Sequence, residues 1–308
     1  RWPKSVSTGD LNDDGALDLV VASQSSNAIT VLLGTGLGTF SAPVNYPTAA
    51  LGTHGIDLGD LNGDGKLDVV ATGSGANFLT VRFGNGDGTF GSETVYAAGS
   101  GPFSVIIKDF NHDGHNDVAT ANTGSRTISI FLNDGTGHLA NQVTYPTGGA
   151  GGQPRSVRAA DLDGDGDVDL AAALGSSMVS VLLGNGDGTF QAARRYPTGN
   201  KPFALTISDI NGDGKLDITT SNNYGNYPKL IHTGGDDVSI LLGKGDGTFL
   251  PPQTDWKVGQ GAFYHDSGDL NCDGAPDIVV PNYWDNTVSV LLNSTGSQVT
   301  CDFTNPVP

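Results

Sequence analysis

The sequence is poor in basic residues and in long apolar segments. Its 15 Lys and Arg residues form no stripe that could neutralise phosphates, which argues against nucleic acid as a partner. No segment reaches the roughly eighteen consecutive apolar residues of a membrane span, so membrane insertion is not expected. No signal peptide is present, which is expected of a processed exported chain.

Glutamate is almost missing from the chain. Glu93 is the only glutamate among 33 acidic residues, whereas glycine occurs 46 times. The acidic residues therefore lie in turns and cation-binding loops and not on helix surfaces. We expect an all-β protein with almost no helix.

The motifs of several enzyme classes are also missing. The sequence has no nucleophile motif, no His-rich zinc spacing and no glycine-rich loop placed before a helix. We therefore expect a non-catalytic protein.

An acidic nine-residue loop is present in six copies along the whole chain. The starts of successive copies are separated by 50, 49, 52, 48 and 60 residues. Such spacing indicates a repeat architecture built from one supersecondary unit. The six copies occupy residues 10–18, 60–68, 109–117, 161–169, 209–217 and 269–277.

Each loop carries oxygen-bearing side chains at positions 1, 3, 5 and 9, with glycine at position 6 for a sharp turn. We expect the backbone carbonyl of position 7 as a further ligand. An all-oxygen set suits Ca²⁺ better than Mg²⁺, so we predict about six structural calcium ions. The predicted ligand residues are Asp10, Asn12, Asp14, Ala16, Asp18, Asp60, Asn62, Asp64, Lys66, Asp68, Asp109, Asn111, Asp113, His115, Asp117, Asp161, Asp163, Asp165, Asp167, Asp169, Asp209, Asn211, Asp213, Lys215, Asp217, Asp269, Asn271, Asp273, Ala275 and Asp277.

The net charge supports a link between metal binding and folding. The formal charge is −18, and 19 aspartates occupy the predicted side-chain ligand positions 1, 3, 5 and 9. Six Ca²⁺ ions would leave a net charge of about −6. Without metal, the clustered carboxylates must repel one another or take up protons, so we expect calcium-dependent stability.

The sequences around the loops indicate strands. An EF-hand needs a longer loop that ends in a bidentate Glu, with amphipathic helices on both sides. Here β-branched runs follow the loops, at residues 17–22 and 67–71, and second runs follow at 29–33 and 128–132. Short alternating runs bounded by Gly, Asn and Asp are strand signals. A glycine-rich turn then predicts a hairpin into a fourth strand.

The aspartate loops, the apolar strand after each loop and a Leu-Leu-Gly-x-Gly-x-Gly-Thr-Phe type of turn together resemble the FG-GAP or VCBS repeats of integrin-alpha-like β-propellers. The turn is found at residues 32–40, 182–190 and 241–249, whereas the copies at 131–139 and 291–299 depart from it. The resemblance implies that each repeat forms one four-stranded antiparallel blade. It also implies that the calcium loop joins the first and second strands of each blade.

We therefore predict one all-β propeller domain over residues 1–308, closed as a ring of six blades. The alternative is a seven-bladed ring whose upstream blade is missing from the sequence. The predicted blades are 1–50, 51–99, 100–150, 151–199, 200–259 and 260–308.

The location of the protein and the state of its cysteines are further predictions. Because extracellular calcium fills even weak sites, a secreted or cell-surface location is favoured. Cys272 lies in the sixth loop and Cys301 near the C-terminus. A disulfide between them and a pair of buried thiols both remain open.

Aromatic residues of blades five and six form the candidate ligand site. The long insertion at residues 222–237 accounts for the 60-residue spacing. Aromatic faces beside Asn and Asp suit sugar rings and equally a protein partner, and the alternative is that these rings only pack the insertion onto the fold. The candidate residues are Tyr224, Tyr227, His232, Tyr264, His265, Tyr283 and Trp284.

Aromatic residues that recur at one position of the repeat are interpreted as core. Tyr46, Tyr96, Tyr145, Tyr196 and Trp256 lie near the end of each predicted fourth strand. Trp2, Phe103, Phe203 and Phe263, at the first strands, are expected to pack between blades.

These features predict a calcium-stabilised extracellular recognition or structural module that binds carbohydrate or a protein partner. One alternative is a subunit of a surface assembly or filament. Another is a polysaccharide-lyase-like enzyme, with His265, Tyr264 and His232 as candidate catalytic groups. The sequence does not predict the ligand or the oligomeric state.

Overall fold

The computed structural model describes residues 2–149, 151–223 and 236–293, with strands as nearly all of their regular structure. The one helix in these ranges is the three-residue 3-10 turn η1 (Gln24–Ser26). No helix of the described residues is long and apolar enough to cross a membrane.

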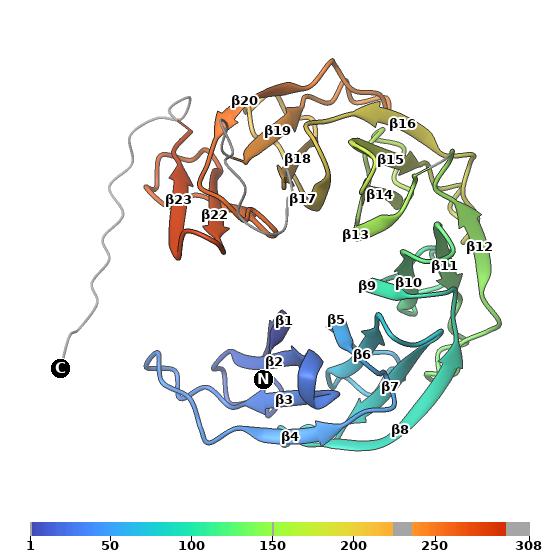
Figure 1. Ribbon diagram of the computed structural model, residues 1–308. Helices are drawn as coiled ribbons and strands as arrows, with labels where there is room; N and C mark the ends of the chain where they lie inside the picture. The colour runs from blue at the N-terminus through green and yellow to red at the C-terminus, as the bar shows by residue number, and fades with distance from the viewer. Residues whose placement is uncertain (1, 150, 224–235, 294–308) are drawn as a thin grey trace. The chain divides into compact units, whose positions relative to one another are not determined.

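The strands form six antiparallel sheets, one for each repeat, and within each sheet they lie side by side in sequence order (Figure 1). The first two sheets contain β1 (Pro3–Gly9), β2 (Asp18–Ser23), β3 (Ala28–Leu32) and β4 (Val44–Pro47), then β5 (Thr53–Gly59), β6 (Asp68–Gly73), β7 (Phe78–Gly84) and β8 (Phe90–Ala97). The third and fourth contain β9 (Pro102–Lys108), β10 (Asp117–Asn122), β11 (Thr127–Phe131) and β12 (Val143–Pro146), then β13 (Pro154–Ala160), β14 (Asp169–Leu174), β15 (Met178–Leu182) and β16 (Arg194–Pro197). The last two contain β17 (Pro202–Ser208), β18 (Asp217–Asn222), β19 (Asp237–Leu241) and β20 (Gln253–Lys257), then β21 (Asp266–Gly268), β22 (Asp277–Asn282) and β23 (Thr287–Leu291).

The predicted all-β propeller of six antiparallel blades is confirmed. Five sheets have four described strands and the sixth has three. The predicted fourth strand of blade six, at residues 298–303, lies outside the described residues. The chain divides into two compact units, Arg1–Ala159 with Gly166–Ala172 and Ser180–Arg194, and Ala160–Asp165 with Ala173–Val179 and Arg195–Pro308.

Proline marks the start of several first strands. Proline has no backbone N–H to donate, so it is tolerated at the first residue of a strand. β1, β9, β13 and β17 all begin with proline, and the pairing of β1, β9 and β17 with their neighbours is irregular at that end. In β1, β9 and β17 the irregular pairing is therefore confined to the proline end, and the regularly paired end is the one that adjoins the acidic loop.

The second strands of blades two to five are completely buried. Most side chains of β6, β10, β14 and β18 are small or β-branched, which suits burial on both faces of the sheet. Apolar clusters join neighbouring sheets: Val20 and Ile29 of the first sheet pack with Val69 of the second, and Val238 of the fifth packs with Val280 of the sixth. The core of each unit thus lies between adjacent blades.

The recurring tyrosines pack as predicted, whereas the prediction for Trp256 is wrong, because its side chain is 43% exposed. The ring of Tyr46 meets Phe90 of the next hairpin edge-on at 5.7 Å, and the equivalent pair Tyr196 and Phe249 lies at 5.1 Å. Edge-to-face pairs of this kind add about 0.5–1.5 kcal/mol beyond the burial of their area. A fourth strand is thereby fixed to the hairpin of the following blade.

The prediction for the first-strand aromatics is correct in part. Phe103, Phe203 and Phe263 are half-buried, and the rings of Phe203 and Phe263 lie 5.0 Å apart. The prediction for Trp2 is wrong, because its side chain is 68% exposed. The carbonyl of Trp2 accepts a bond from the amide of Gln24, so its backbone is fixed while its ring extends into solvent.

A buried histidine gives the fold a pH-dependent stability. His54 on β5 is buried, its ring stacks on Phe103 with 3.4 Å between centroids, and burial lowers its pKa to about 3. The unfolded chain binds the proton first, so the contribution of neutral His54 is complete above pH 6.5 and is lost as the pH falls toward 3. Lowering the pH from 7 to 4.5 should therefore reduce the unfolding free energy of the parent protein by about 2–3 kcal/mol more than that of a His54→Leu variant. Urea titrations at both pH values measure this difference, and equal losses for the two proteins would contradict it.

Candidate calcium loops and an aromatic ligand site

Each acidic loop connects the first and second strands of its blade, as the sequence predicts. The carboxylate at position 1 closes the loop on itself. In the first loop Gly15 N–H donates to Asp10 Oδ2 at 2.7 Å, and this bond lowers the pKa of the Asp10 carboxyl. The same bond is found at Asp60, Asp109, Asp209 and Asp269, at 2.8, 3.0, 2.8 and 2.9 Å.

Position 6 needs glycine because its backbone is left-handed. The φ angle of Gly15 is +82°, and an added Cβ atom would meet no other atom within 4 Å. Backbone strain and not lack of space therefore selects glycine here. The other five copies, Gly65, Gly114, Gly166, Gly214 and Gly274, have φ angles of +80, +85, +93, +80 and +86°.

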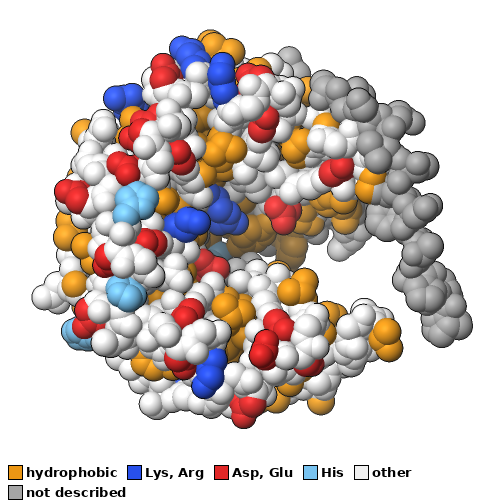
Figure 2. All heavy atoms as spheres, turned by 180° about the vertical axis from the view of Figure 1, so that it is seen from behind, with side chains coloured by type: hydrophobic (Ala, Val, Ile, Leu, Met, Phe, Trp, Pro, Cys, Tyr) orange, Lys and Arg blue, Asp and Glu red, His pale blue; other side chains and the backbone are white. Residues whose placement is uncertain are grey.

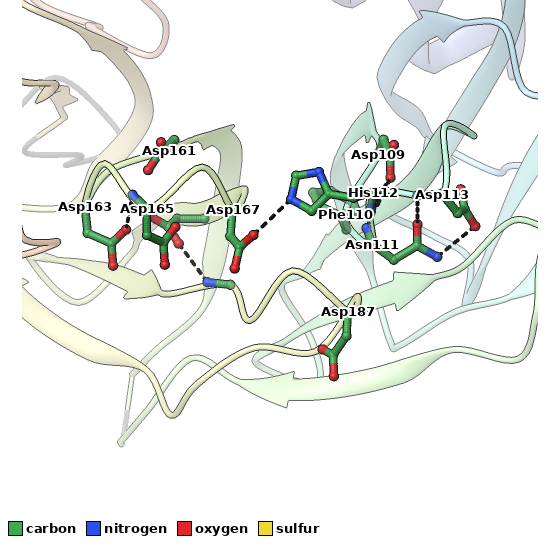
Figure 3. Close-up of polar contacts among 12 residues, drawn as sticks. Asp109, Phe110, Asn111, His112, Asp113, Asp161, Asp163, Asp165, Asp167 and Asp187 are labelled. Atoms are coloured by element: carbon green, nitrogen blue, oxygen red, sulfur yellow. Dashed lines mark hydrogen bonds and ion pairs between the residues drawn. The ribbon is translucent and has the colours of Figure 1, made fainter.

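The side chains at positions 3 and 5 fold back over the loop. In the third loop Asp113 N–H donates to Asn111 Oδ1 at 3.1 Å, and Asn111 Nδ2 donates to Asp113 Oδ2 at 2.9 Å (Figure 3). The amide of the position 7 residue, His115, donates to the other oxygen of Asp113 at 2.9 Å. Oxygens of Asn111 and Asp113 are thereby held on a short turn, and hard oxygen donors of this kind would suit a calcium ion. The predicted use of the position 7 carbonyls stays a prediction.

The aspartate at position 9 has a second role that the sequence analysis missed. Asp18 is fully buried, and its two oxygens accept from the amides of Leu11 at 2.8 Å and Gly34 at 2.7 Å. The first amide belongs to the same loop, and the second belongs to the hairpin after the third strand. Asp68, Asp117, Asp217 and Asp277 make the same pair of bonds. An ionised carboxylate has about four acceptor sites, so the residue can fix this hairpin and still contribute to a cation site.

Burial and neighbouring charges disfavour ionisation of two of these buried aspartates, Asp68 and Asp117. Burial, with a smaller contribution from the other carboxylates of the loop, raises the pKa of Asp68 and of Asp117 to about 6. Burial also raises the pKa of Asp163, where Asp165 and Asp161 add repulsion. A bound cation would remove this penalty.

The fourth loop gathers its carboxylates most closely. Ligand oxygens of Asp161, Asp163 and Asp169 all lie within 4.8 Å of one another. Figure 3 shows the first two projecting from the same turn as Asp165. Three hard oxygen donors at this spacing fit a divalent cation such as Ca²⁺.

A direct contact joins the third and fourth loops. His112, at position 4 of the third loop, lies with its Nε2 atom 2.9 Å from Oδ1 of Asp167 (Figure 3). Asp167 is at position 7 of the fourth loop, where the sequence analysis assigns a role only to the carbonyl. Both side chains are partly exposed, so the pair contributes little to stability on its own.

Part of the predicted ligand site forms an aromatic cluster, which we define as Phe203, Phe263, Tyr264, Tyr283 and Trp284. The Phe263 ring lies 5.0 Å from Phe203, 5.8 Å from Tyr283 and 6.3 Å from Trp284. Tyr283 and Trp284 meet edge-on at 4.6 Å. Tyr283 is 63% exposed and Trp284 is 40% exposed. The cluster thus has half-buried phenylalanines beneath rings that reach solvent.

The backbone beneath the cluster is well fixed. Gly261 has a φ of +85°, and its carbonyl accepts from the Tyr283 amide at 3.1 Å. The Trp284 amide donates to the Gln260 carbonyl at 3.0 Å, and Asp236 Oδ2 accepts from the Gly261 amide at 2.6 Å. The aromatic side chains are therefore carried on a hydrogen-bonded frame.

The remaining predicted residues lie elsewhere. Tyr224, Tyr227 and His232 lie outside the described residues. His265 is buried, and its Nε2 atom lies 2.8 Å from Thr219 Oγ1, so its ring is not part of the exposed aromatic cluster.

The two cysteines are only partly described. Cys272 carries no free thiol. Cys301, its predicted partner, lies outside the described residues.

Acidic groups predominate among the charged side chains of the surface. Figure 2 shows Asp and Glu side chains distributed over the face drawn, with fewer Lys and Arg side chains between them. This distribution agrees with the formal charge of −18.

Solved structures with the same fold include proteins of several kinds. A lectin of Agrocybe aegerita, whose structure is described as the basis of specific recognition of non-reducing terminal N-acetylglucosamine, is 21% identical with a TM-score of 0.59, over 95% of this chain and 81% of the lectin. A functionally unknown protein from Desulfotomaculum acetoxidans is 12% identical with a TM-score of 0.65, over 96% and 84% of the chains. Kuenenia stuttgartiensis hydrazine synthase is 12% identical with a TM-score of 0.56, over 95% and 96%. At these identities the likeness shows the fold alone.

Sequence comparisons identify the family. A search of curated proteins finds no match. The FG-GAP-like repeat matches four times in succession, at residues 10–71, 60–120, 109–172 and 161–220, and each match begins at position 1 of an acidic loop. The chain therefore belongs to the FG-GAP-like repeat family of β-propellers.

Proposed function

We propose that this protein is a non-catalytic, extracellular recognition module that binds carbohydrate through its aromatic cluster, on a scaffold whose six loops bind Ca²⁺. The observation that carries the proposal is the cluster itself, in which Tyr283 and Trp284 reach solvent above a fixed frame. Aromatic rings with one accessible face and a polar handle suit the C–H faces and hydroxyls of a sugar. A solved structure with the same fold is that of a lectin, so the fold is compatible with this class of ligand.

Calcium is proposed for the loops because their donors are all oxygen and lie on alternate residues of short turns. When bound, the ions would neutralise clustered carboxylates and hold each loop against its hairpin. A secreted or cell-surface location follows from the same chemistry, since extracellular calcium is abundant enough to fill weak sites.

A lyase-like activity receives less support. Of its candidate groups, His265 is buried and bonded to Thr219, and His232 lies outside the described residues. Incubation of the protein with uronate polymers should release no unsaturated product that absorbs in the ultraviolet. Appearance of such a product would refute the non-catalytic assignment.

The carbohydrate proposal predicts that glycan binding depends on Trp284 and not on Trp2. Trp284→Ala should weaken glycan binding by roughly 30-fold, the loss of about 2 kcal/mol typical of an aromatic anchor at a hot spot. Trp2→Ala is the matched control, because Trp2 is also exposed but lies outside the cluster. The measurement is a glycan array of the calcium-loaded protein, followed by titration of the strongest glycan.

The array separates the proposal from its alternatives. Binding that survives Trp284→Ala and a Tyr283→Ala, Trp284→Ala double variant would place the site elsewhere. Failure of the parent protein to bind any glycan would favour a protein partner or a role in a surface assembly.

A further inference from the structure

A cavity in the first unit occupies the position between blades two and three. It has a volume of about 460 Å³ and is lined by the β6–β7 loop at 74–77, by residues 100–103 at the start of β9, and by the β10–β11 loop at 123–124. Small-molecule sites in proteins typically have volumes of about 300–1,000 Å³. The cavity is therefore large enough to hold a small ligand.

The cavity is built on the same frame as the aromatic cluster. Each of its key residues has a counterpart 160 positions later in the repeat. The counterparts are Ser100 and Gln260, Gly101 and Gly261, Phe103 and Phe263, Thr123 and Tyr283, and Gly124 and Trp284.

The hydrogen bonds of the two frames agree closely. Thr123 N–H donates to the Gly101 carbonyl at 3.0 Å, and Gly124 N–H donates to the Ser100 carbonyl at 2.9 Å. The equivalent bonds of the aromatic cluster measure 3.1 and 3.0 Å. Both turn glycines have positive φ, +62° at Gly101 and +85° in the cluster. The two pairs of turn bonds therefore match, whereas the side chains differ and the first strand begins at Pro102 in one copy and only at Asp266 in the other.

The difference in side chains explains the open space. Threonine and glycine stand at 123 and 124, where the later copy has tyrosine and tryptophan. Phe103 also lines the cavity, and its ring lies on His54 at an interplanar angle of 33°, whereas Phe263 meets Phe203 edge-on. One copy of the frame thus presents protruding aromatic rings, and the other presents a hollow with one aromatic wall.

The lining has the chemistry of a neutral polar site. Its hydroxyls belong to Ser74, Ser100 and Thr123, and Asn77 adds an exposed amide that can both donate and accept. None of the described lining residues carries a charge, and burial holds neighbouring His54 neutral at ordinary pH by lowering its pKa to about 3. The net charge of −18 disfavours an anionic ligand.

We propose that this cavity is a second binding site, which takes a single neutral sugar residue with the sugar ring against Phe103 and its hydroxyls on the loops at 74–77 and 123–124. The inference rests on the proposed function only for the class of ligand, because the two sites lie in different blades.

Amide shifts in a titration of the full-length, calcium-loaded protein test the inference. The probes are the neutral methyl glycosides of N-acetylglucosamine, galactose and mannose, with methyl glucuronide as the anionic comparison. At least one neutral glycoside should shift the amides of Gly75, Gly101 and Gly124 with a Kd on the order of 1 mM, as expected of a single small sugar. The glucuronide should shift them at least tenfold more weakly.

Two variants and one control locate the binding. Ser100→Trp should fill the cavity and weaken binding there by more than tenfold. Asn77→Ala changes an exposed loop residue, which the fold will tolerate, and should weaken binding by about three- to tenfold, the loss of one hydrogen bond. Ser92→Trp is the matched control, because Ser92 is exposed on β8 and does not line the cavity.

The outcomes for the two sites are distinguishable. If no neutral glycoside shifts the amides of 74–77, 100–103 and 123–124, or if Ser100→Trp binds like Ser92→Trp, the second site does not exist. Shifts at Tyr283 and Trp284 report separately on the aromatic cluster. The proposed function can therefore survive the loss of the second site, and the second site can survive the loss of the first.

Discussion

Removal of calcium is expected to lower the melting temperature of the protein by more than about 10 °C. At a calcium concentration of 100 times Kd, each site adds about 2.7 kcal/mol to the unfolding free energy. In a protein of this size 1 kcal/mol corresponds to about 2 °C, so several sites together give a large shift. The carboxylates left behind would repel one another, since 19 aspartates occupy positions 1, 3, 5 and 9 of the six loops. Scanning calorimetry in millimolar calcium chloride and in chelator measures the shift.

Magnesium serves as the control for this experiment. Mg²⁺ carries the same charge but prefers to keep several waters, so it should restore only a small part of the shift. Equal melting temperatures in calcium and in chelator would contradict calcium binding by the loops.

Asp117→Ala is expected to destabilise the protein by about 2–6 kcal/mol, because it removes the acceptor of two buried amides that each cost about 1–3 kcal/mol when left unpaired. These amides belong to Phe110 and Asn133 and lie 3.0 and 2.7 Å from the carboxylate oxygens. The second bond fixes the hairpin after β11. Because neither bond involves a metal, the loss should persist in chelator. Denaturant titrations with and without calcium measure it.

Asp113→Ala is the matched control within the same loop. Asp113 is exposed and bonds only within the loop in the contacts described, to Asn111 and His115. Its replacement should reduce stability in calcium but have little effect in chelator. If Asp117→Ala and Asp113→Ala behave alike in both buffers, position 9 is only a metal ligand and does not fix the hairpin.

The blades and loops could be predicted because both depend on local sequence. Each loop concentrates its acidic residues and its glycine within nine residues, and the period of about fifty residues repeats the pattern six times. The predicted strand bounds differ from the observed ones by one or two residues, as in the predicted 17–22 and 67–71 and the observed Asp18–Ser23 and Asp68–Gly73. Repetition thus made weak local signals decisive.

Features that depend on distant residues could not be predicted. The second acceptor role of Asp18 needs the amide of Gly34, 16 residues away in another turn. His265 was predicted as a ligand-site residue because it lies beside aromatic residues in the sequence. In the structure it is buried, because it packs against Thr219 of the preceding blade. The contact between His112 and Asp167 spans 55 residues and two loops. In each case the partner is brought near only by the stacking of blades.

The cavity between blades two and three could not be predicted from the sequence for a different reason. Its frame resembles that of the aromatic cluster, but its small side chains give no signal in the sequence. A cluster of aromatic residues in a sequence predicts a binding site, whereas glycine and serine at the same positions predict only an ordinary turn. Comparison of equivalent positions within a repeat protein can therefore reveal sites that composition hides.

The number of calcium ions bound per chain is the most direct test of the calcium-stabilised propeller. The protein is stripped with chelator and exchanged into calcium-free buffer. It is then titrated with calcium chloride in a calorimeter, while elemental analysis gives the bound metal after dialysis. Six loops with intact ligand positions predict about six ions per chain. Less than one ion per chain at millimolar calcium would contradict the role assigned to the loops.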